Sequence, residues 1–207
     1  MYKLYGAAAS RAFRCIWTFC ELNVDFEHIH LSFTNRDTKS RSFLEKNPMG
    51  KVPLLEYNGQ FLFESGAICS FIAQKNRQKT DLIGAEGSLF RANVEKWLFF
   101  TLSEFEQPLW NIRKHTMIYP LELRCENIIK SANLDFSRAL SALKNSIKDL
   151  YIVNNTFSLA DIFIAQTLFW ANEVKAIESN LTYFDDYLKR LKEREGFPRI
   201  KDYLPRK

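Results

Sequence analysis

Short apolar runs separated by polar breaks mark the first third of the chain, and they predict strands and helices in turn. Two such runs flank Asn58 and Gly59, a dipeptide that tolerates the positive φ angles of a tight turn, so we expect a β-hairpin. Pro53 begins the first run, which suits a strand start because proline has no N–H to donate. A helical period follows, with Ser65 as its predicted N-cap. The free N–H groups of that helix start predict a site for a small extended ligand with a carboxylate.

The residues before this hairpin predict a βαβ unit. A β-prone run at 2–5 leads to a helical face at positions 13, 16, 17 and 20, and a second strand pattern follows at 26–31. Ser10 stands just before the helical face, as an N-cap residue does. With a short helix expected at 42–46, the order predicts one small sheet in which two parallel strands and an antiparallel hairpin carry helices on their faces.

Helical periods replace the strand patterns in the remainder of the chain. The polar stretch at 78–87 contains two glycines and is typical of a linker. We therefore expect an α/β domain at 1–77 and an all-α domain, a helical bundle, at 88–207. The helices predicted in the second domain cover 94–109, about 121–150, the segment after 157, about 185–195 and the neighbourhood of residue 200.

The clearest helix start lies at 157–162. Ser158 and Asp161 form the Ser-x-x-acid pattern of a capping box, in which each side chain accepts the backbone N–H of the other residue. Phe157 and Ile162 occupy the positions of a hydrophobic staple. The residues that follow are apolar on nearly every side, so we expect this helix to be the buried centre of the bundle.

Composition supports a globular protein and gives little sign of a nucleic-acid partner. The 207 residues are 46% hydrophobic and 14% aromatic, which is enough for a sizeable core. The net charge is +5, but acidic residues interleave with most of the basic ones, including those near the end of the chain that lead to Arg206 and Lys207. This mixture favours solvated helix surfaces over a nucleic-acid interface.

The cysteine and histidine positions predict no metal site. The cysteines form no Cys-x-x-Cys pair, and the histidines have no partners at metal-ligand spacing. Cys15 is expected to be a buried, unreactive thiol, because it lies in the body of the first helix rather than at its start. The residues concerned are Cys15, Cys20, Cys69, Cys125, His28, His30 and His115.

The apolar runs also indicate the cellular compartment in which we expect the protein. The first residues lack the long apolar run and small-residue cleavage site of a signal peptide. The longest apolar candidate, at 162–171, is shorter than a membrane span and contains Gln166 and Thr167. We therefore expect a reduced, cytoplasmic protein with no membrane partner.

Three motifs, in this order and at this spacing, give the chain a family resemblance. They lie at 47–55 (Asn-Pro-Met-Gly-Lys-Val-Pro-Leu-Leu), 64–68 (Glu-Ser-Gly-Ala-Ile) and 157–162 (Phe-Ser-Leu-Ala-Asp-Ile). Together they resemble a cytosolic glutathione S-transferase over essentially the whole chain. The segments at 97–100 and 187–198 resemble bacterial members, of a serine, theta or beta type. The resemblance implies a thioredoxin-like first domain, glutathione as co-substrate, a homodimer, and no metal or prosthetic group.

The resemblance also implies which residues bind glutathione. It implies that Pro53 is cis and that the N–H and C=O of Val52 pair with the cysteinyl part of glutathione, as an added strand does. By the family pattern, Ser65 and its helix start suit the γ-glutamyl carboxylate and Glu64 suits the ammonium. Lys51 is the candidate for the glycyl carboxylate.

The candidate catalytic residue is Ser10. Lowering the pKa of a thiol by about two units from ~8.5 requires roughly 2.7 kcal/mol of preferential stabilisation of the thiolate. A hydroxyl donor and a helix N-terminus together supply this order of magnitude. Ser10 is the only hydroxyl in the loop at 7–11 and stands where the family places its activating residue. Arg11 or a backbone N–H is the alternative contact to the sulfur, and Ser10 is then an ordinary cap.

The predicted function is transfer of glutathione: its thiolate attacks a small, mostly apolar electrophile, a detoxification reaction. Trp110 and Arg113 are candidates for the pocket of that second substrate, and they are equally compatible with packing and surface roles. The alternative is a non-catalytic binding or regulatory protein of the same fold that acts in a stress response, because fold does not fix function. The sequence does not identify the electrophile.

Overall fold

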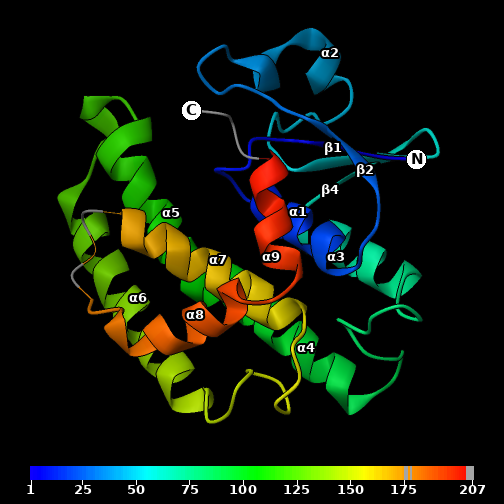
Figure 1. The fold of residues 1–207 in the computed structure, drawn as a ribbon. Helices are drawn as coiled ribbons and strands as arrows, with labels where there is room; N and C mark the ends of the chain where they lie inside the picture. Colours follow the sequence, from blue (N-terminus) through cyan, green and yellow to red (C-terminus); the bar gives the residue numbers. More distant parts are fainter. Residues whose placement is uncertain (175–176, 178, 204–207) are drawn as a thin grey trace. The chain divides into compact units, whose positions relative to one another are not determined.

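The computed structural model describes residues 1–174, 177 and 179–203, which form two compact units (Figure 1). One unit contains Met1–Gly84 together with residues 192–203, and the other contains Ala85–Leu191. The basic residues Arg206 and Lys207 lie outside the described residues. The domain limits expected from the sequence, 1–77 and 88–207, stay a prediction.

The described residues of the first unit form a four-stranded sheet in the order β2-β1-β3-β4. β1 (Tyr2–Tyr5) pairs in parallel with β2 (Phe26–Ile29), as the βαβ pattern predicts. β3 (Leu54–Tyr57) pairs antiparallel with both β1 and β4 (Gln60–Phe63). The fold class is therefore confirmed as a thioredoxin-like α/β unit followed by a helical one.

The hairpin turn forms where the sequence places it. Asn58 has φ of 50° and Gly59 has φ of 74°, so both central residues adopt the left-handed conformation that this turn requires. The strands predicted at 2–5 and 26–31 start where expected and end within two residues of the predicted limits. β3 begins one residue after Pro53, because the missing N–H of proline excludes it from the ladder.

The helices of the first unit begin at positions that correct two capping predictions. α1 (Ala12–Glu21) has Arg11 as N-cap, and α3 (Ser65–Lys75) has Glu64 as N-cap, so neither Ser10 nor Ser65 is the cap residue. The reason is the backbone. The chain already turns at Ser10, whose N–H donates to the Ala7 carbonyl, and the left-handed Glu64 starts α3 one residue early. The remaining elements are η1 (Asp37–Lys39) and α2 (Arg41–Leu44).

The last described segment, α9 (Gly196–Arg199) with η6 (Ile200–Tyr203), packs against α1 and β2. The ring of Phe197 lies 4.9 Å from that of Trp17 in an edge-on arrangement. Tyr203 stacks on Phe26 with ring centroids 4.6 Å apart. The guanidinium of Arg194 binds the carboxylate of Glu21 through both Nε and Nη2, the latter at 3.0 Å from Oε2. These contacts explain why residues so distant along the chain belong to one unit.

Gly196→Ala is expected to lower the free energy of unfolding by about 1–3 kcal/mol, since overpacking forces the backbone to shift. A Cβ at Gly196 would lie 2.8 Å from the Cα of Glu21, and backbone atoms cannot move aside as a side chain does. Urea denaturation of the variant measures the loss. Lys201→Ala, an exposed change nearby, is the control and should change stability by less than about 0.5 kcal/mol. A Gly196→Ala variant as stable as this control would contradict the close packing.

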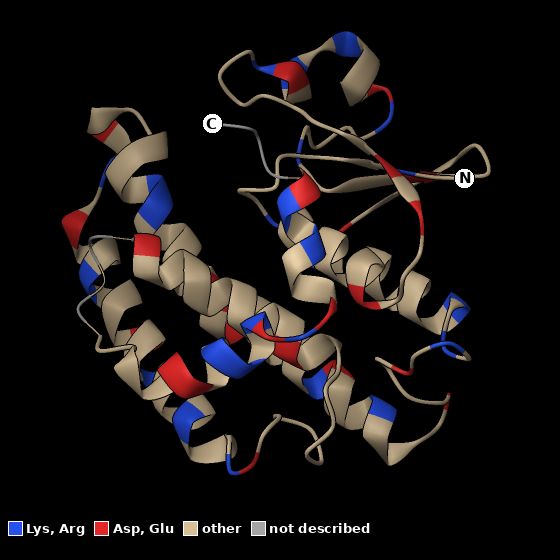
Figure 2. Cartoon of the chain, in the orientation of Figure 1, with Lys and Arg blue, Asp and Glu red and all other residues tan. Residues whose placement is uncertain are grey.

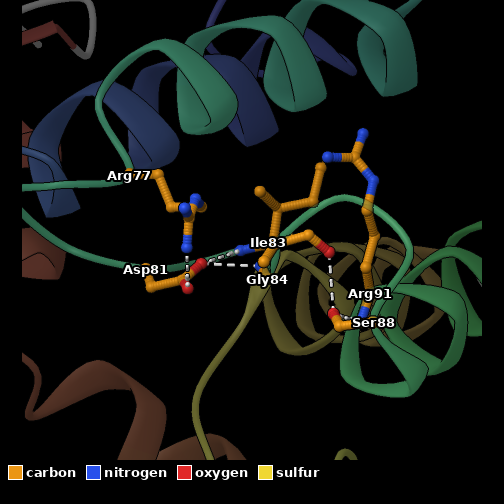
Figure 3. A network of polar contacts seen from close by, with 7 residues as sticks. Arg77, Asp81, Ile83, Gly84, Ser88 and Arg91 are labelled. Carbon is orange, nitrogen blue, oxygen red and sulfur yellow. Dashed lines mark hydrogen bonds and ion pairs between the residues drawn. The ribbon is translucent and has the colours of Figure 1, made fainter.

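The stretch at 78–87 that resembles a linker has defined turns (Figure 3). The carboxylate of Asp81 accepts the N–H groups of Ile83, at 3.2 Å, and Gly84, at 2.6 Å. The other carboxylate oxygen of Asp81 accepts a hydrogen bond from the guanidinium of Arg77 at 3.3 Å. Ser88 then caps the next helix, α4 (Leu89–Phe100), through its hydroxyl. Side-chain hydrogen bonds therefore replace the missing secondary structure along this stretch.

The second unit is built from helices. The first run passes from α4 through the wider π turn η2 into α5, and Pro108 follows that turn, where it has no N–H to offer the carbonyl of Glu104. A further π turn, η3, ends the run. The elements are α4 (Leu89–Phe100), η2 (Thr101–Phe105), α5 (Glu106–Arg113), η3 (Lys114–Ile118), η4 (Leu121–Leu123), α6 (Glu126–Ser146), α7 (Leu159–Glu173), η5 (Thr182–Phe184) and α8 (Asp185–Lys192).

α7 is the buried helix of this unit, as its apolar sequence predicts. The capping box at its start is confirmed: the carboxylate of Asp161 accepts the N–H of Ser158 at 2.9 Å. The same carboxylate accepts the N–H of Ile152 at 3.1 Å and the hydroxyl of Tyr187 at 2.7 Å. Burial raises the pKa of Asp161, and these hydrogen bonds act in the opposite direction. No helix in the described part of the chain is both long and apolar enough to cross a membrane.

Charged residues of both signs are spread over the elements of each unit (Figure 2). Several pair within one helical turn, such as Arg91 with Glu95 at 2.8 Å and Lys130 with Glu126 at 3.1 Å. Such pairs contribute about 0.3–0.5 kcal/mol each and are typical of solvated helix surfaces. The interleaving read from the sequence therefore describes ordinary exposed faces.

Candidate glutathione site

The loop before β3 is held by Asn47, whose role the sequence reasoning missed. Asn47 is 1% exposed, and its amide donates to the Lys51 carbonyl at 2.8 Å while its side-chain oxygen accepts the Met49 N–H at 3.2 Å. Gly50 has φ of 58°, and a Cβ there would lie 2.8 Å from the Thr38 carbonyl. The available signal was an asparagine before proline, a residue type that commonly bonds to nearby backbone. These contacts fix where Lys51 and the next residues stand.

Val52 and Pro53 present unused backbone beside the sheet. Their peptide bond is cis, as the family resemblance implies. Among the described residues, neither the N–H nor the C=O of Val52 has a hydrogen-bond partner, whereas Leu54 pairs with Tyr5 of β1. Val52 is half-buried and Pro53 is buried. This backbone is therefore open to pairing with an extended ligand.

Glu64 and Ser65 form the start of α3 at the other end of the hairpin. Glu64 has φ of 71°, a conformation that costs a non-glycine residue about 1–3 kcal/mol and that gathers at ligand sites. Its side chain is exposed, whereas Ser65 is 2% exposed. The first-turn N–H groups of a helix have no acceptor inside it and favour an anion. Ser65 lies at the right place for a carboxylate, although it is the first helical residue rather than the cap.

Arg14 is the second residue that the sequence reasoning missed. It lies on α1, is fully buried, and its Nη1 donates to the Ser65 hydroxyl oxygen at 3.4 Å. The only sequence signal was an arginine inside a largely apolar helix. A buried arginine needs partners that a one-dimensional pattern does not reveal.

Ser10 lies in the turn between β1 and α1 and is partly exposed. Its hydroxyl donates to the Ala7 carbonyl at 2.6 Å and accepts the Ala12 N–H at 3.1 Å. Gly6 makes this turn possible, because its φ is 156° and a Cβ there would lie 2.6 Å from that of Ala12. The Ser10 hydroxyl is thus held at the start of α1, with one hydrogen that is able to turn from Ala7 toward a ligand.

Tyr5 is a neighbouring hydroxyl, but it is already engaged. Tyr5 donates to the Glu56 carboxylate at 2.5 Å and accepts from Lys46 at 3.0 Å. The hydrogen bond from Tyr5, with smaller contributions from Lys3 and Lys46, lowers the pKa of Glu56. Because the Tyr5 hydroxyl is engaged in these two bonds, Ser10 remains the candidate hydroxyl for contact with a ligand.

Cys15 and Cys69 do not qualify as nucleophiles. Both are fully buried between α1 and α3, and their sulfurs lie 3.7 Å apart. Burial, followed by the hydrogen bond shared with Cys69, raises the pKa of Cys15 well above its ordinary value, so it stays a thiol. The expectation that Cys15 is buried is confirmed.

Two of the histidines, His28 and His115, bond to backbone groups. Nε2 of His28 lies 2.9 Å from the Gly6 carbonyl, and burial lowers the pKa of this imidazole. Nδ1 of His115 accepts the N–H of Cys125 at 3.1 Å. In the described ranges, no three or more His, Cys, Asp or Glu residues gather as a metal site would require.

Trp110 and Arg113 belong to the second unit, on α5. The ring of Trp110 lies 6.5 Å from that of Trp170, and the Arg113 side chain is exposed. A groove of about 390 Å³ lies between the η2–α5 run and α6, and its lining includes Gln107 and Arg138 but neither predicted pocket residue. The assignment of Trp110 and Arg113 to a second-substrate pocket therefore stays a prediction.

The first unit thus brings Ser10, Val52, Glu64 and Ser65 into one thioredoxin-like domain, and a helical unit follows. Within the first unit, unpaired backbone at Val52 and a buried serine at a helix start suit a small extended anionic ligand. Comparison with known proteins supplies the family. Residues 1–74 match the glutathione S-transferase N-terminal domain, and residues 126–206 match the glutathione S-transferase C-terminal domain. The chain therefore belongs to the glutathione S-transferase family.

Similarity to individual relatives supports the same family assignment. Glutathione S-transferase F13 of Arabidopsis thaliana is 32% identical over 168 residues, which cover 77% of this chain and 75% of that protein. The structure of glutathione transferase F7 from Populus trichocarpa has a TM-score of 0.83 and 25% identity, with 100% of both chains covered. Ure2p in complex with glutathione has a TM-score of 0.83 at 17% identity over 96% of this chain and 91% of that one, which shows the shared fold. The plant relatives give no support to the narrower expectation of a bacterial serine, theta or beta type.

Proposed function

We propose that the chain is a glutathione transferase in which the thiolate of glutathione attacks a small, mostly apolar electrophile. The family match over both parts of the chain and the curated relatives that are named as glutathione S-transferases support this function. They do not favour the non-catalytic alternative. The observation that carries the assignment is the unpaired Val52 backbone in the same unit as the buried Ser65 at a helix start.

The proposed binding mode follows the shape of the ligand. The Val52 N–H and C=O pair with the cysteinyl part of glutathione as an added strand, next to Pro53. The γ-glutamyl carboxylate lies on the Ser65 hydroxyl and the first-turn N–H groups of α3, with its ammonium on the Glu64 carboxylate. Lys51, which is exposed, meets the glycyl carboxylate.

In the proposed chemistry, Ser10 stabilises the thiolate. Its hydroxyl hydrogen turns from the Ala7 carbonyl to the glutathione sulfur, and the start of α1 adds a favourable dipole. The thiol proton leaves to solvent, the sulfur forms a bond to the electrophilic carbon, and the leaving group departs with its electron pair. Arg11 and the backbone N–H groups of the turn are the alternative contacts to the sulfur.

The finer features are part of the same proposal. Residues 1–77 bind glutathione and 88–207 supply the helical domain, with Trp110 and Arg113 in the pocket of the second substrate. The protein is a cytoplasmic homodimer that serves detoxification, uses no metal, and has neither nucleic-acid nor membrane partners.

Immobilised glutathione followed by a conjugation assay tests the function. We expect the chain to be retained, to elute with free glutathione, and to couple glutathione to an aryl halide. Ser65→Ala is expected to weaken retention, whereas Ser42→Ala, an exposed change on α2, should leave it unchanged. Failure of the wild-type chain to bind would overturn the proposal, and binding without conjugation would favour the non-catalytic alternative.

A further inference from the structure

We propose that Arg14 is a positioning residue: it orients the Ser65 hydroxyl so that its hydrogen is directed at the γ-glutamyl carboxylate of glutathione. This inference rests on the proposed function, in which Ser65 meets that carboxylate. It adds a residue of α1 to the γ-glutamyl contacts, which the proposed function otherwise places at Glu64, Ser65 and the first turn of α3.

The hydrogen-bonding capacity of arginine determines the direction of the Ser65 hydroxyl. A guanidinium only donates, so the contact between Nη1 of Arg14 and Oγ of Ser65, at 3.4 Å, uses a lone pair of the serine oxygen. In the part of the chain that the structure describes, this is the only hydrogen bond of the Ser65 hydroxyl. Its single hydrogen therefore remains available to an acceptor outside the protein, and a carboxylate offers one.

The position of Ser65 in α3 prevents a common competing bond. A serine inside a helix often donates to the carbonyl four residues earlier. Because Ser65 is the first helical residue, the residue four positions before it is Phe61, which lies in β4. The Ser65 hydroxyl therefore has no helical carbonyl four residues earlier to which it could donate its hydrogen.

Burial makes the Arg14 charge effective. Arg14 is fully buried and Ser65 is 2% exposed, so the contact is screened little by water. The first turn of α3 itself carries no cation: Ser65 is followed by Gly66 and Ala67. The guanidinium therefore adds positive charge behind the helix N-terminus, where the carboxylate binds.

Steady-state kinetics with glutathione test the role. Arg14→Met is expected to raise the KM for glutathione about tenfold, because charged hydrogen bonds have this order of effect, with kcat reduced much less. Arg14→Lys keeps the charge without the planar fork and should recover part of the affinity. The matched control is Thr18→Val, a fully buried change one turn along α1, where Oγ1 bonds to the Arg14 carbonyl. It should leave KM unchanged.

A ligand analogue separates positioning from general structural damage. In 4-aminobutyryl-cysteinyl-glycine the γ-glutamyl carboxylate is absent, so the loss caused by Arg14→Met should disappear with this peptide. An equal loss with glutathione and the analogue would overturn the inference, as would an unchanged KM in Arg14→Met. Failure of wild-type binding would overturn the proposed function itself.

A second variant keeps the test valid if Arg14→Met does not fold. Arg14→Lys should raise the KM for glutathione in the wild-type background and have little further effect in Ser65→Ala, because the two residues act as one unit. Equal effects of Arg14→Lys in both backgrounds would overturn the inference.

Discussion

Asp161→Ala is expected to lower the free energy of unfolding by about 3–5 kcal/mol, the range for removing one partner from a buried charged network. The carboxylate is fully buried and accepts from the Ser158 N–H, the Ile152 N–H and the Tyr187 hydroxyl. Alanine leaves all three donors buried without an acceptor, at about 1–3 kcal/mol for each group. Urea denaturation followed by circular dichroism measures the loss.

Two further variants make the Asp161 prediction specific. Tyr187→Phe removes one donor and should cost only about 1–2 kcal/mol, because the capping box survives. Asp149→Ala, an exposed change in the preceding loop, should stay within about 0.5 kcal/mol of the wild-type chain. If Asp161→Ala were no less stable than Asp149→Ala, the buried network would not support the helical unit.

Ser10→Ala is expected to reduce turnover at pH 7 by up to roughly 25-fold, the limit reached if the hydroxyl supplies the whole pKa shift, while leaving the affinity for glutathione nearly intact. If the hydroxyl and helix start lower the thiol pKa to about 6.5, about three quarters of bound glutathione is thiolate at pH 7, against about 3% at a pKa of ~8.5. The deficit should shrink as pH rises from 7 and nearly vanish above ~8.5, because the variant then ionises its thiol without help. A pH series of kcat measures both effects.

Ser10→Thr is the matched control, because it keeps a hydroxyl at the same position. It should retain most of the turnover, whereas Ser10→Ala should not. Both variants are expected to remain folded, since the two hydrogen bonds of Ser10 lie within one short turn. Turnover unchanged in Ser10→Ala would transfer the activating role to Arg11 or to a backbone N–H.

Local patterns predicted the elements of the fold that depend on neighbouring residues. Asn58 and Gly59 produced the hairpin turn because both adopt the left-handed conformation that few residues tolerate. Ser158 and Asp161 produced the capping box because the pattern spans one helical turn. The family motifs added the cis bond before Pro53, which no local propensity indicates.

Features that depend on tertiary structure could not be predicted from the sequence. The predicted start of α3 was wrong by one residue, because the positive φ of Glu64 cannot be predicted from a pattern of residue types. Arg14 and Asn47 have side chains typical of surfaces, and only the packed fold shows that they are buried. The ion pair between Arg194 and Glu21 joins residues 173 positions apart, a separation beyond any periodicity.

The pKa of the glutathione thiol, measured in the complex by the ultraviolet absorption of its thiolate, tests the central claim most directly. We expect the glutathione thiol to titrate about two units below the ~8.5 of a free thiol in the wild-type complex, and closer to that free value in the Ser10→Ala complex. Glutathione that titrates in the wild-type complex as it does in free solution would contradict the account.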